Sequence, residues 1–597
     1  MINKTTNNFI NSIPVLVGLI AGLFLFTFNV TGFDFKFFPG DLGDGRFNLY
    51  LLEHAYKFFT GEISNFWDAP FMYPESNVIS YSDNLLGSAL FYSLFRLLGF
   101  DVYLSYQLWF VTVSVLNYLA AYYFLKYVFK NNYAAVLGAF IFAFSLALQS
   151  QLTHSQTFPR FAIPLALLMA VKFSEELKPK YFLYTLIFVV YQIYCGIYLG
   201  FMLTIPVTIL LILIVIKSVI EGSNKIFNGK WLMQMAGSLF ISLLVLLPLM
   251  LPYTERKISS NYGHYQQILH TIPTIKSHFY SQEGSVFWDF LSKTASDYKA
   301  FWDHQIFAGG IATISLIAGV LWLIVKLYKN KFNIKAIPVT GLLFLTAVIT
   351  FILFIRFRGI SAYVAIYFIP GFSSLRAITR IINVELIFFA LAVAFAVSQI
   401  YKYKIKYGFL LFVLILALVV ADNYFYRGKS YRTEVGQAKK RTKQIDKIFS
   451  KIPAGSIVSY EPLKMDALPA YFQLDAMLEA QKFGLKTLNA YTATSPFDYE
   501  MYWNKPDEKS RNYWLRSKKL NQDSIYIVKN PETMIKLAFK DIQPEQLISP
   551  LRIKIDNMKR YIKTDKEWMK KIRKKAMERN ISVDSMLEID AKWAIEN

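Results

Sequence analysis

The chain has 597 residues, of which 54% are hydrophobic and 17% aromatic, and its formal net charge is +23. Only 18% of its residues are charged, whereas soluble domains carry about 25%, so the composition excludes an ordinary soluble globular protein. Apolar runs of roughly 17 to 25 residues recur, and each is long enough to cross a bilayer as a helix. The sequence therefore predicts a polytopic membrane protein.

The apolar runs predict about eleven membrane-spanning helices. They lie near residues 13–32, 102–126, 133–150, 160–174, 181–197, 199–217, 231–251, 308–327, 337–356, 381–400 and 408–422. The stretch 85–99 is apolar but short, and Arg96 interrupts it, so we expect a helix at the membrane interface there. The first run lacks a cleavage site of small residues, which favours a retained helix over a signal peptide.

Lysines and arginines predict the orientation of these spans. They concentrate in the short loops around residues 126–130, 172–180, 217–230, 326–335 and 402–406, which the positive-inside rule makes cytoplasmic. The N-terminus is then cytoplasmic, and the loop 33–101, later loops and the C-terminal region lie outside. All six histidines fall in those outside loops. We therefore expect the polar chemistry on the extracytoplasmic face.

The stretch "FPGDLGDGRFNLYLLEH", residues 38–54, places Asp41 and Asp44 at the outer end of the first span. One interpretation is that these acids cap the helix that follows, since Asp favours a helix N-terminus. The other is that one of them is a general base for an acceptor hydroxyl. Both interpretations remain open from the sequence.

A late outside loop, "PGFSSLRAITR", carries Arg376 and Arg380. Their i, i+4 spacing predicts that both guanidinium groups lie on one helical face, where they could grip a phosphate bidentately. The alternative is ordinary basic flanking of a span, although the positive-inside rule does not require arginines on this side. Further candidates are polar residues of the outside loops and of the span that follows Arg380, namely Asp83, His54, His154, Arg160, Arg358 and Glu385. Glu385 is expected inside that span, where an acid could be functional or could neutralise Arg380.

The region from residue 423 onward has a different character. "GSIVSYEP" and "SIYIVKN" have strand patterns, "LPAYFQLDAMLEAQKFG" has a helical pattern, and the last segment predicts two or three amphipathic helices. We expect a smaller α/β domain with a helical tail, residues 423–597, after a membrane domain of residues 1–422. Its basic surface could contact anionic lipid headgroups or could simply be a solvated helical face. Nucleic acid is not expected as a partner on the outer side of the membrane.

The arrangement resembles the GT-C-fold membrane glycosyltransferases, which include protein O-mannosyltransferases, aminoarabinose transferases and oligosaccharyltransferase subunits. The matching features are "GDLGDGR" after the first span, interfacial helices at "RFNLYLLEHAYKFF" and "NLLGSALFYSLFRLLG", "LQSQLTHSQTFPRFAIPLALL", "PGFSSLRAITR" and the soluble C-terminal region. The resemblance covers roughly residues 10–422 and is nearest to large bacterial members. It implies an all-α polytopic, GT-C-like fold in the bacterial inner membrane, with the smaller α/β domain extracytoplasmic.

The resemblance implies an inverting glycosyltransferase that moves a sugar from a polyprenyl-phosphate donor to a glycan, lipid or protein acceptor. Asp44, or Asp41, would be the base, and Arg376 and Arg380 would bind the donor phosphate. The sequence lacks the adjacent Asp-Glu pair of the mannosyltransferases, which leaves open both the position of the base and a divalent metal such as Mg²⁺ or Mn²⁺. The alternatives from other classes are a lipid-linked glycan flippase or transporter and a non-catalytic membrane scaffold.

Overall fold

The structure is a computed structural model that describes residues 2–223, 226, 228–255, 265–403, 405–463, 468–518, 524–530, 533–538 and 550–596. The chain forms two compact units. The first comprises Met1–Glu62, Asp83–Met250 and Tyr265–Gly436, and the second comprises Ile63–Ser82, Leu251–His264 and Gln437–Asn597.

Each of the eleven predicted spans coincides with a helix. The first is α1 (Ile2–Gly22), which continues through one π-helical turn (Leu23–Thr27) into α2 (Phe28–Thr31). The others are α5 (Val102–Phe129), α6 (Asn132–Phe144), α7 (Ala162–Glu176), α8 (Pro179–Cys195), α9 (Ile197–Ile220), α10 (Gly229–Glu255), α12 (Gly310–Lys329), α13 (Val339–Phe354), α15 (Ile382–Ile400) and α16 (Gly408–Asp422).

Seven helical segments in the described part of the chain are long and apolar enough to cross a membrane, namely Ser12–Thr31, Val102–Phe129, Ser155–Glu176, Ile197–Ile220, Gly229–Glu255, Gly310–Lys329 and Ile378–Ile400. Shorter apolar helices include α13, α16 and the predicted interfacial helix α4 (Leu86–Leu97). At 1.5 Å per residue, α4 spans only about 18 Å, which is less than a bilayer core. The chain is a polytopic membrane protein.

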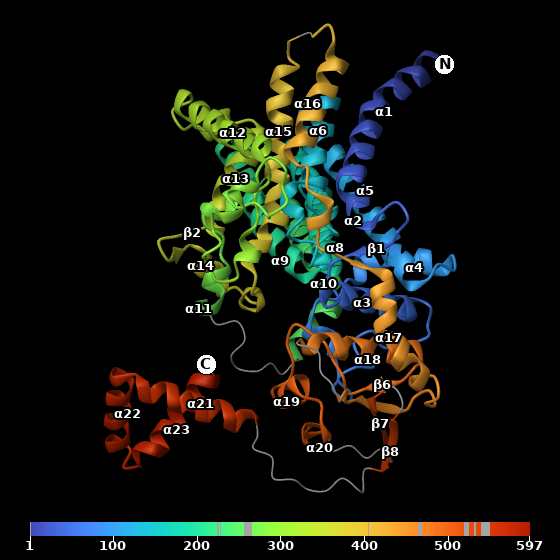
Figure 1. Cartoon of the computed structure of the whole chain (residues 1–597). Helices are drawn as coiled ribbons and strands as arrows, with labels where there is room; N and C mark the ends of the chain where they lie inside the picture. The colour runs from blue at the N-terminus through green and yellow to red at the C-terminus, as the bar shows by residue number, and fades with distance from the viewer. Residues whose placement is uncertain are drawn as a thin grey trace. The chain divides into compact units, whose positions relative to one another are not determined.

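Helix α15 forms the centre of the first unit. Beyond its first turn, which carries Asn383 and Glu385, its sequence is almost entirely apolar. It packs against α6 and α12, while α6 also contacts α1 and α5. A helix without a polar face is stable only when it is buried on every side or faces lipid. The amphipathic helix α3 (Asp44–Phe59) and α4 lie at one end of this bundle, and the connection between α15 and α16 lies at the other (Figure 1).

A short antiparallel pair holds the loop that carries the two acids. Strand β1 (Phe37–Pro39) pairs with β4 (Arg432–Glu434), with Phe37 opposite Glu434. The segment after α16 thus pairs with the first unit, and the last part of the second unit starts at Gln437. The expected domain boundary at residue 422/423 therefore differs from the observed one, because the β1–β4 pairing keeps residues 423–436 with the first unit.

The remaining elements of the first unit belong to its loops. Helices α11 (Tyr265–Ile268) and α14 (Tyr363–Tyr367) are short, and strands β2 (Arg356–Phe357) and β3 (Ile360–Ser361) form a small hairpin. Several 3-10 turns complete these loops, including Ser155–Thr157, Phe301–His304 and Ile378–Ile381.

The second unit contains the α/β domain that the sequence predicts. Its sheet has the order β6-β5-β7-β8, with β5 (Ile457–Tyr460) parallel to β6 (Lys486–Thr487) and β7 (Ser524–Asn530), and β8 (Thr533–Ala538) antiparallel to β7. Apolar side chains of α17 (Val435–Phe449) and α18 (Pro469–Lys482) form a core with β5 and β7. The other helices are α19 (Glu500–Asn504), α20 (Glu508–Ser517), α21 (Pro550–Thr564), α22 (Lys566–Glu578) and α23 (Val583–Glu596).

Candidate functional site

Asp41 organises the turn between β1 and α3. Its Oδ1 accepts hydrogen bonds from the backbone N–H groups of Gly43 at 3.0 Å and Gly45 at 3.4 Å. Gly40 has a φ of +94°, and a Cβ there would lie 3.1 Å from the Cα of Gly45, so this turn requires glycine. Burial, followed by the charge of Asp44, raises the pKa of Asp41. The capping interaction that the sequence left open therefore belongs to Asp41.

Asp44, the first residue of α3, contacts a histidine instead. Its Oδ2 lies 2.9 Å from Nδ1 of His154, and Nε2 of His154 lies 4.0 Å from Oδ1 of Asp303. The exposed fractions of these side chains are 27% for Asp44, 19% for His154 and 16% for Asp303. One imidazole thus lies between two carboxylates that remain accessible to a substrate.

Asp303 was not predicted from the sequence. It lies in the turn Phe301–His304, and the next residue fixes this turn, because Nδ1 of His304 lies 2.7 Å from Oγ of Ser277 and its Nε2 lies 2.8 Å from the carbonyl oxygen of His270. Burial lowers the pKa of His304, which favours a neutral ring with one donor and one acceptor nitrogen. No motif or spacing in the sequence brings Asp303 to His154, since the contact arises only from tertiary packing.

The turn that carries His154 links the acids to a second polar group. Asn48 of α3 donates a hydrogen bond to Oε1 of Gln156 at 2.9 Å. On its other side this turn lies against the start of α9, where a Cβ at Gly196 would be 3.2 Å from the carbonyl oxygen of Gln156 and 3.6 Å from Oδ2 of Asp83. Asp44 and Asp83 therefore approach the same turn from two sides.

Asp83 caps the N-terminus of α9. Its Oδ1 accepts hydrogen bonds from the N–H groups of Ile197 at 2.8 Å and Asn84 at 3.0 Å, whereas its Oδ2 is buried and has no partner among the described residues. Burial raises the pKa of Asp83 to about 6, although the N–H groups of Ile197 and Asn84 and the charge of Arg380 oppose this rise. A carboxyl group with such a pKa changes charge near neutral pH.

Tyr198, in the first turn of α9, brings the two candidate arginines together. The backbone N–H of Arg376 donates to its hydroxyl at 2.6 Å, and the guanidinium of Arg380 lies 4.9 Å from its ring centroid. Nε of Arg380 is buried without a hydrogen-bond partner in the described part of the chain. Both arginines thus contact Tyr198. The prediction that they share one face of an α-helix is wrong, because residues 375–377 are not helical and only a 3-10 turn, Ile378–Ile381, follows them.

Arg160 and Glu385 have partners other than those expected. Arg160 is fully buried rather than lining a cleft, and it donates to Oδ1 of Asn383 and to the carbonyl oxygen of Phe142, both at 3.2 Å. Glu385 lies 3.2 Å from Nε2 of His278, so it does not neutralise Arg380. Burial opposes protonation of His278, but the hydrogen bond and charge of Glu385 outweigh it and raise the pKa of His278.

His54 and Arg358 lie away from these contacts. His54 is buried in α3 with its ring stacked on Tyr50 at 6.2 Å, which is a packing role. Arg358 is exposed at the tip of the β2–β3 hairpin, 5.3 Å from the ring centroid of Phe357.

A metal centre is not formed by the residues that the structure describes. No group of three or more His, Cys, Asp or Glu side chains among them is arranged to hold a metal ion. In the acid pair around His154, both ring nitrogens already face carboxylates.

The fold and these residues define a polytopic membrane protein with acids and arginines gathered near one edge of its helical bundle. No protein-family model and no curated protein matches the chain. Its structure is similar to the Archaeoglobus fulgidus oligosaccharyltransferase in complex with Zn and sulfate, at 13% identity and a TM-score of 0.44, over 86% of this chain and 67% of that one. It is also similar to AglB from the same organism in complex with an inhibitory peptide and a dolichol-phosphate, at 12% identity and a TM-score of 0.44, over 87% and 69%.

A third similar structure is the arabinofuranosyltransferase AftD from Mycobacteria, at 13% identity and a TM-score of 0.43, over 87% of this chain but 35% of that one. These neighbours are oligosaccharyltransferases and an arabinofuranosyltransferase. At such scores the likeness assigns neither an activity nor a substrate to this chain.

Proposed function

We propose that the protein is an inverting glycosyltransferase that moves a sugar from a polyprenyl-phosphate donor to an acceptor hydroxyl or amide at the extracytoplasmic face of a bacterial inner membrane. The observation that carries this proposal is the convergence of two groups on the turn of His154 and Gln156. One group is the acid pair Asp44 and Asp303 around His154, and the other is Arg380 beside Tyr198 and Asp83.

Asp44 is the proposed general base. Its Oδ2 is held by His154 at 2.9 Å, and its side chain is partly exposed, so an acceptor group can approach it. In the transfer, the acceptor oxygen or nitrogen forms a bond to the anomeric carbon while its proton moves to the carboxylate of Asp44. Asp41, whose Oδ1 is engaged with the backbone of the turn, holds this loop and is the second candidate for the base.

The arginines are the proposed partners of the leaving phosphate. When the bond between the anomeric carbon and the phosphate oxygen breaks, its electrons remain on the polyprenyl phosphate, and a fixed guanidinium stabilises that charge. Arg380 suits this role because Tyr198 orients it and its Nε lacks a partner among the described residues. Arg380 lies at the start of the candidate span Ile378–Ile400, where a lipid phosphate would lie at the membrane edge.

The experiment that tests this function uses the purified protein in lipid with a panel of polyprenyl-phosphate sugars. Release of polyprenyl phosphate and transfer of labelled sugar are measured together for the wild type, Asp44→Asn and the exposed-loop control Asp34→Asn. We expect transfer by the wild type and by Asp34→Asn, and loss of transfer in Asp44→Asn. A transporter would move the donor across a vesicle membrane without breaking the bond between sugar and phosphate, and that result would contradict the proposal.

A further inference from the structure

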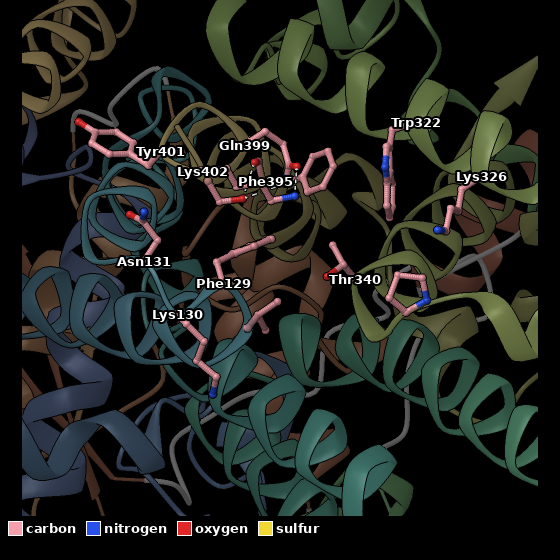
Figure 2. Close-up of a pocket in the computed structure, with 13 residues that line it drawn as sticks. Phe129, Lys130, Asn131, Trp322, Lys326, Thr340, Phe395, Gln399, Tyr401 and Lys402 are labelled. Carbon is pink, nitrogen blue, oxygen red and sulfur yellow. Dashed lines mark hydrogen bonds between the residues drawn. The ribbon is translucent and has the colours of Figure 1, made fainter. Parts of the chain in front are cut away.

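A cavity of about 500 Å³ lies at the opposite end of the first unit, and the acids and arginines described above take no part in it. It lies among the ends of four helices and is lined at the C-terminal ends of α5, α12 and α15 and near the start of α13 (Figure 2). Three lysines from three different segments line it: Lys130 after α5, Lys326 in α12 and Lys402 after α15.

These lysines have no acidic counterpart around the cavity. None of the three forms an ion pair within the part of the chain that the structure describes. The surrounding sequence explains this, because residues 126–149, 310–354 and 386–421 contain no Asp or Glu at all. Lys130 lies 3.9 Å from the ring centroid of Tyr127, whose hydroxyl donates to Glu175, and Lys402 donates to Oε1 of Gln399. Neither ammonium group is therefore paired directly with a carboxylate in the described part of the chain, and no Asp or Glu lines the cavity.

The other walls of the cavity are apolar or neutral. Phe129, Trp322 and Phe395 lie between the lysines in Figure 2, and the rings of Trp322 and Phe395 are 4.8 Å apart. Neutral polar groups come from Asn131 and Thr340. A lining that combines three cations with neighbouring aromatic side chains matches a ligand that has a phosphate at one end and a hydrocarbon part next to it.

The position of the cavity indicates where such a ligand comes from. Val102–Phe129, Gly310–Lys329 and Ile378–Ile400 are candidate spans, and the cavity lies where all three end. Arg380 lies at the other end of the last of them. At 1.5 Å per residue, the 19 residues of α15 separate the two levels by about 28 Å, which is close to the thickness of a bilayer core. The cavity is therefore at the membrane edge opposite the candidate active site.

We propose that this cavity binds an anionic phospholipid of the leaflet opposite the catalytic groups. The lipid phosphate lies among Lys130, Lys326 and Lys402, and an acyl chain runs along Trp322 and Phe395. A lipid suits the cavity better than free phosphate because aromatic side chains line it beside the lysines and because it lies where three candidate spans end. By the lysine distribution this leaflet is the cytoplasmic one. The site does not depend on the proposed transferase activity.

The test measures the affinity of the detergent-purified full chain for added lipid, from the shift of its melting temperature during titration. The probes are phosphatidylglycerol, phosphatidylcholine and inorganic phosphate. The triple variant Lys130→Gln, Lys326→Gln, Lys402→Gln removes the cations of the cavity. A matched triple variant, Lys329→Gln, Lys331→Gln, Lys335→Gln, removes three lysines of the neighbouring α12–α13 connection that do not line it.

We expect phosphatidylglycerol, but neither phosphatidylcholine nor inorganic phosphate, to raise the melting temperature of the wild type. Each cavity lysine should contribute about fivefold to lipid affinity, and the matched triple variant should behave as the wild type. Thr340→Trp, which fills the cavity but keeps every lysine, should also weaken lipid binding. An equal shift with inorganic phosphate would identify a free-anion site, and equal losses in both triple variants would identify a general basic surface. Either result, or an unchanged affinity in all variants, overturns the proposal.

Discussion

Oδ2 of Asp44 lies 2.9 Å from Nδ1 of His154, although 110 residues separate them in the sequence. This contact fixes the direction of a carboxylate that would otherwise rotate freely at the first position of a helix. It also distinguishes the two acids of the loop, because Asp41 points its Oδ1 into the backbone of its own turn. The structure thereby separates a carboxylate that interacts with another side chain from one that organises the main chain.

Asparagine variants of the two acids test that distinction. Asp44→Asn keeps the size of the side chain but cannot accept a proton, so we expect sugar transfer to fall by about 10²- to 10⁴-fold. Asp41→Asn retains an oxygen for the N–H groups of Gly43 and Gly45, and Asn caps about as well as Asp, so its rate should change little. Rates are measured at saturating donor. If both single variants and the double variant transfer at the wild-type rate, both acids are structural.

The arginine pair gives a prediction about donor binding. Arg380→Ala should weaken use of the donor by about 1.5 to 3 kcal/mol, the contribution of a hydrogen bond to a charged group. Lysine at this position should rescue only part of the loss, because an ammonium group cannot bind a phosphate bidentately. We expect a smaller effect for Arg376→Ala, since the contact of Arg376 with Tyr198 is made by its backbone. The measurement is kcat/KM for the donor, and an unaltered value in the double alanine variant would remove the phosphate site.

Asp83 gives a prediction about pH. Burial raises its pKa to about 6 from the ordinary 3.8, so protonation is favoured in the folded state. Its contribution to the free energy of unfolding is complete below pH 3.8 and is lost as the pH rises through about 6. At about pH 4, Asp83→Asn should therefore be no more stable than the wild type. At about pH 7.5 its stability relative to the wild type should be higher than it is at about pH 4.

Melting temperatures of the wild type and Asp83→Asn at the two pH values check this prediction. Asp34→Asn, which removes one carboxylate at an exposed position, is the control for the loss of a negative charge. A constant difference between the wild type and Asp83→Asn would show that the Asp83 carboxyl does not titrate in this range.

Seven of the eleven expected spans coincide with helical segments that are long and apolar enough to cross a membrane. These were predictable because each is encoded locally, by an apolar run of sufficient length. The acid loop and the arginine loop were also recognisable, because acids follow the first apolar run directly and because arginines flank a span on the side where the positive-inside rule does not require them. Asp303, Tyr198 and the partner of Glu385 were not, because nothing local specifies which loops meet. The prediction that Arg376 and Arg380 share a helical face failed for a related reason, because the non-helical residues before the turn Ile378–Ile381 break the helical spacing.

The orientation of the chain gives a further prediction. The eleven spans expected from the sequence, together with the lysine distribution, predict that the C-terminal region lies outside the cytoplasm. A reporter that is active only in the cytoplasm should be silent when it is fused after residue 597 and active when it is fused after Gly222, in a loop expected to be cytoplasmic. Activity at the C-terminal fusion would mean that one expected span, such as α8 with its 17 residues, does not cross the membrane.

His154 is expected to position Asp44 rather than to bind substrate. His154→Ala removes a hydrogen bond to a carboxylate, which contributes about 1.5 to 3 kcal/mol, so kcat should fall by roughly 10- to 150-fold with little change in KM for the donor. His154→Gln can still donate a hydrogen bond to Oδ2 of Asp44 and should restore part of the rate. His270→Gln is the matched control, because His270 is exposed and only its backbone oxygen contacts His304. If alanine and glutamine at position 154 lower kcat equally, or if KM rises instead, the imidazole does more than orient the carboxylate.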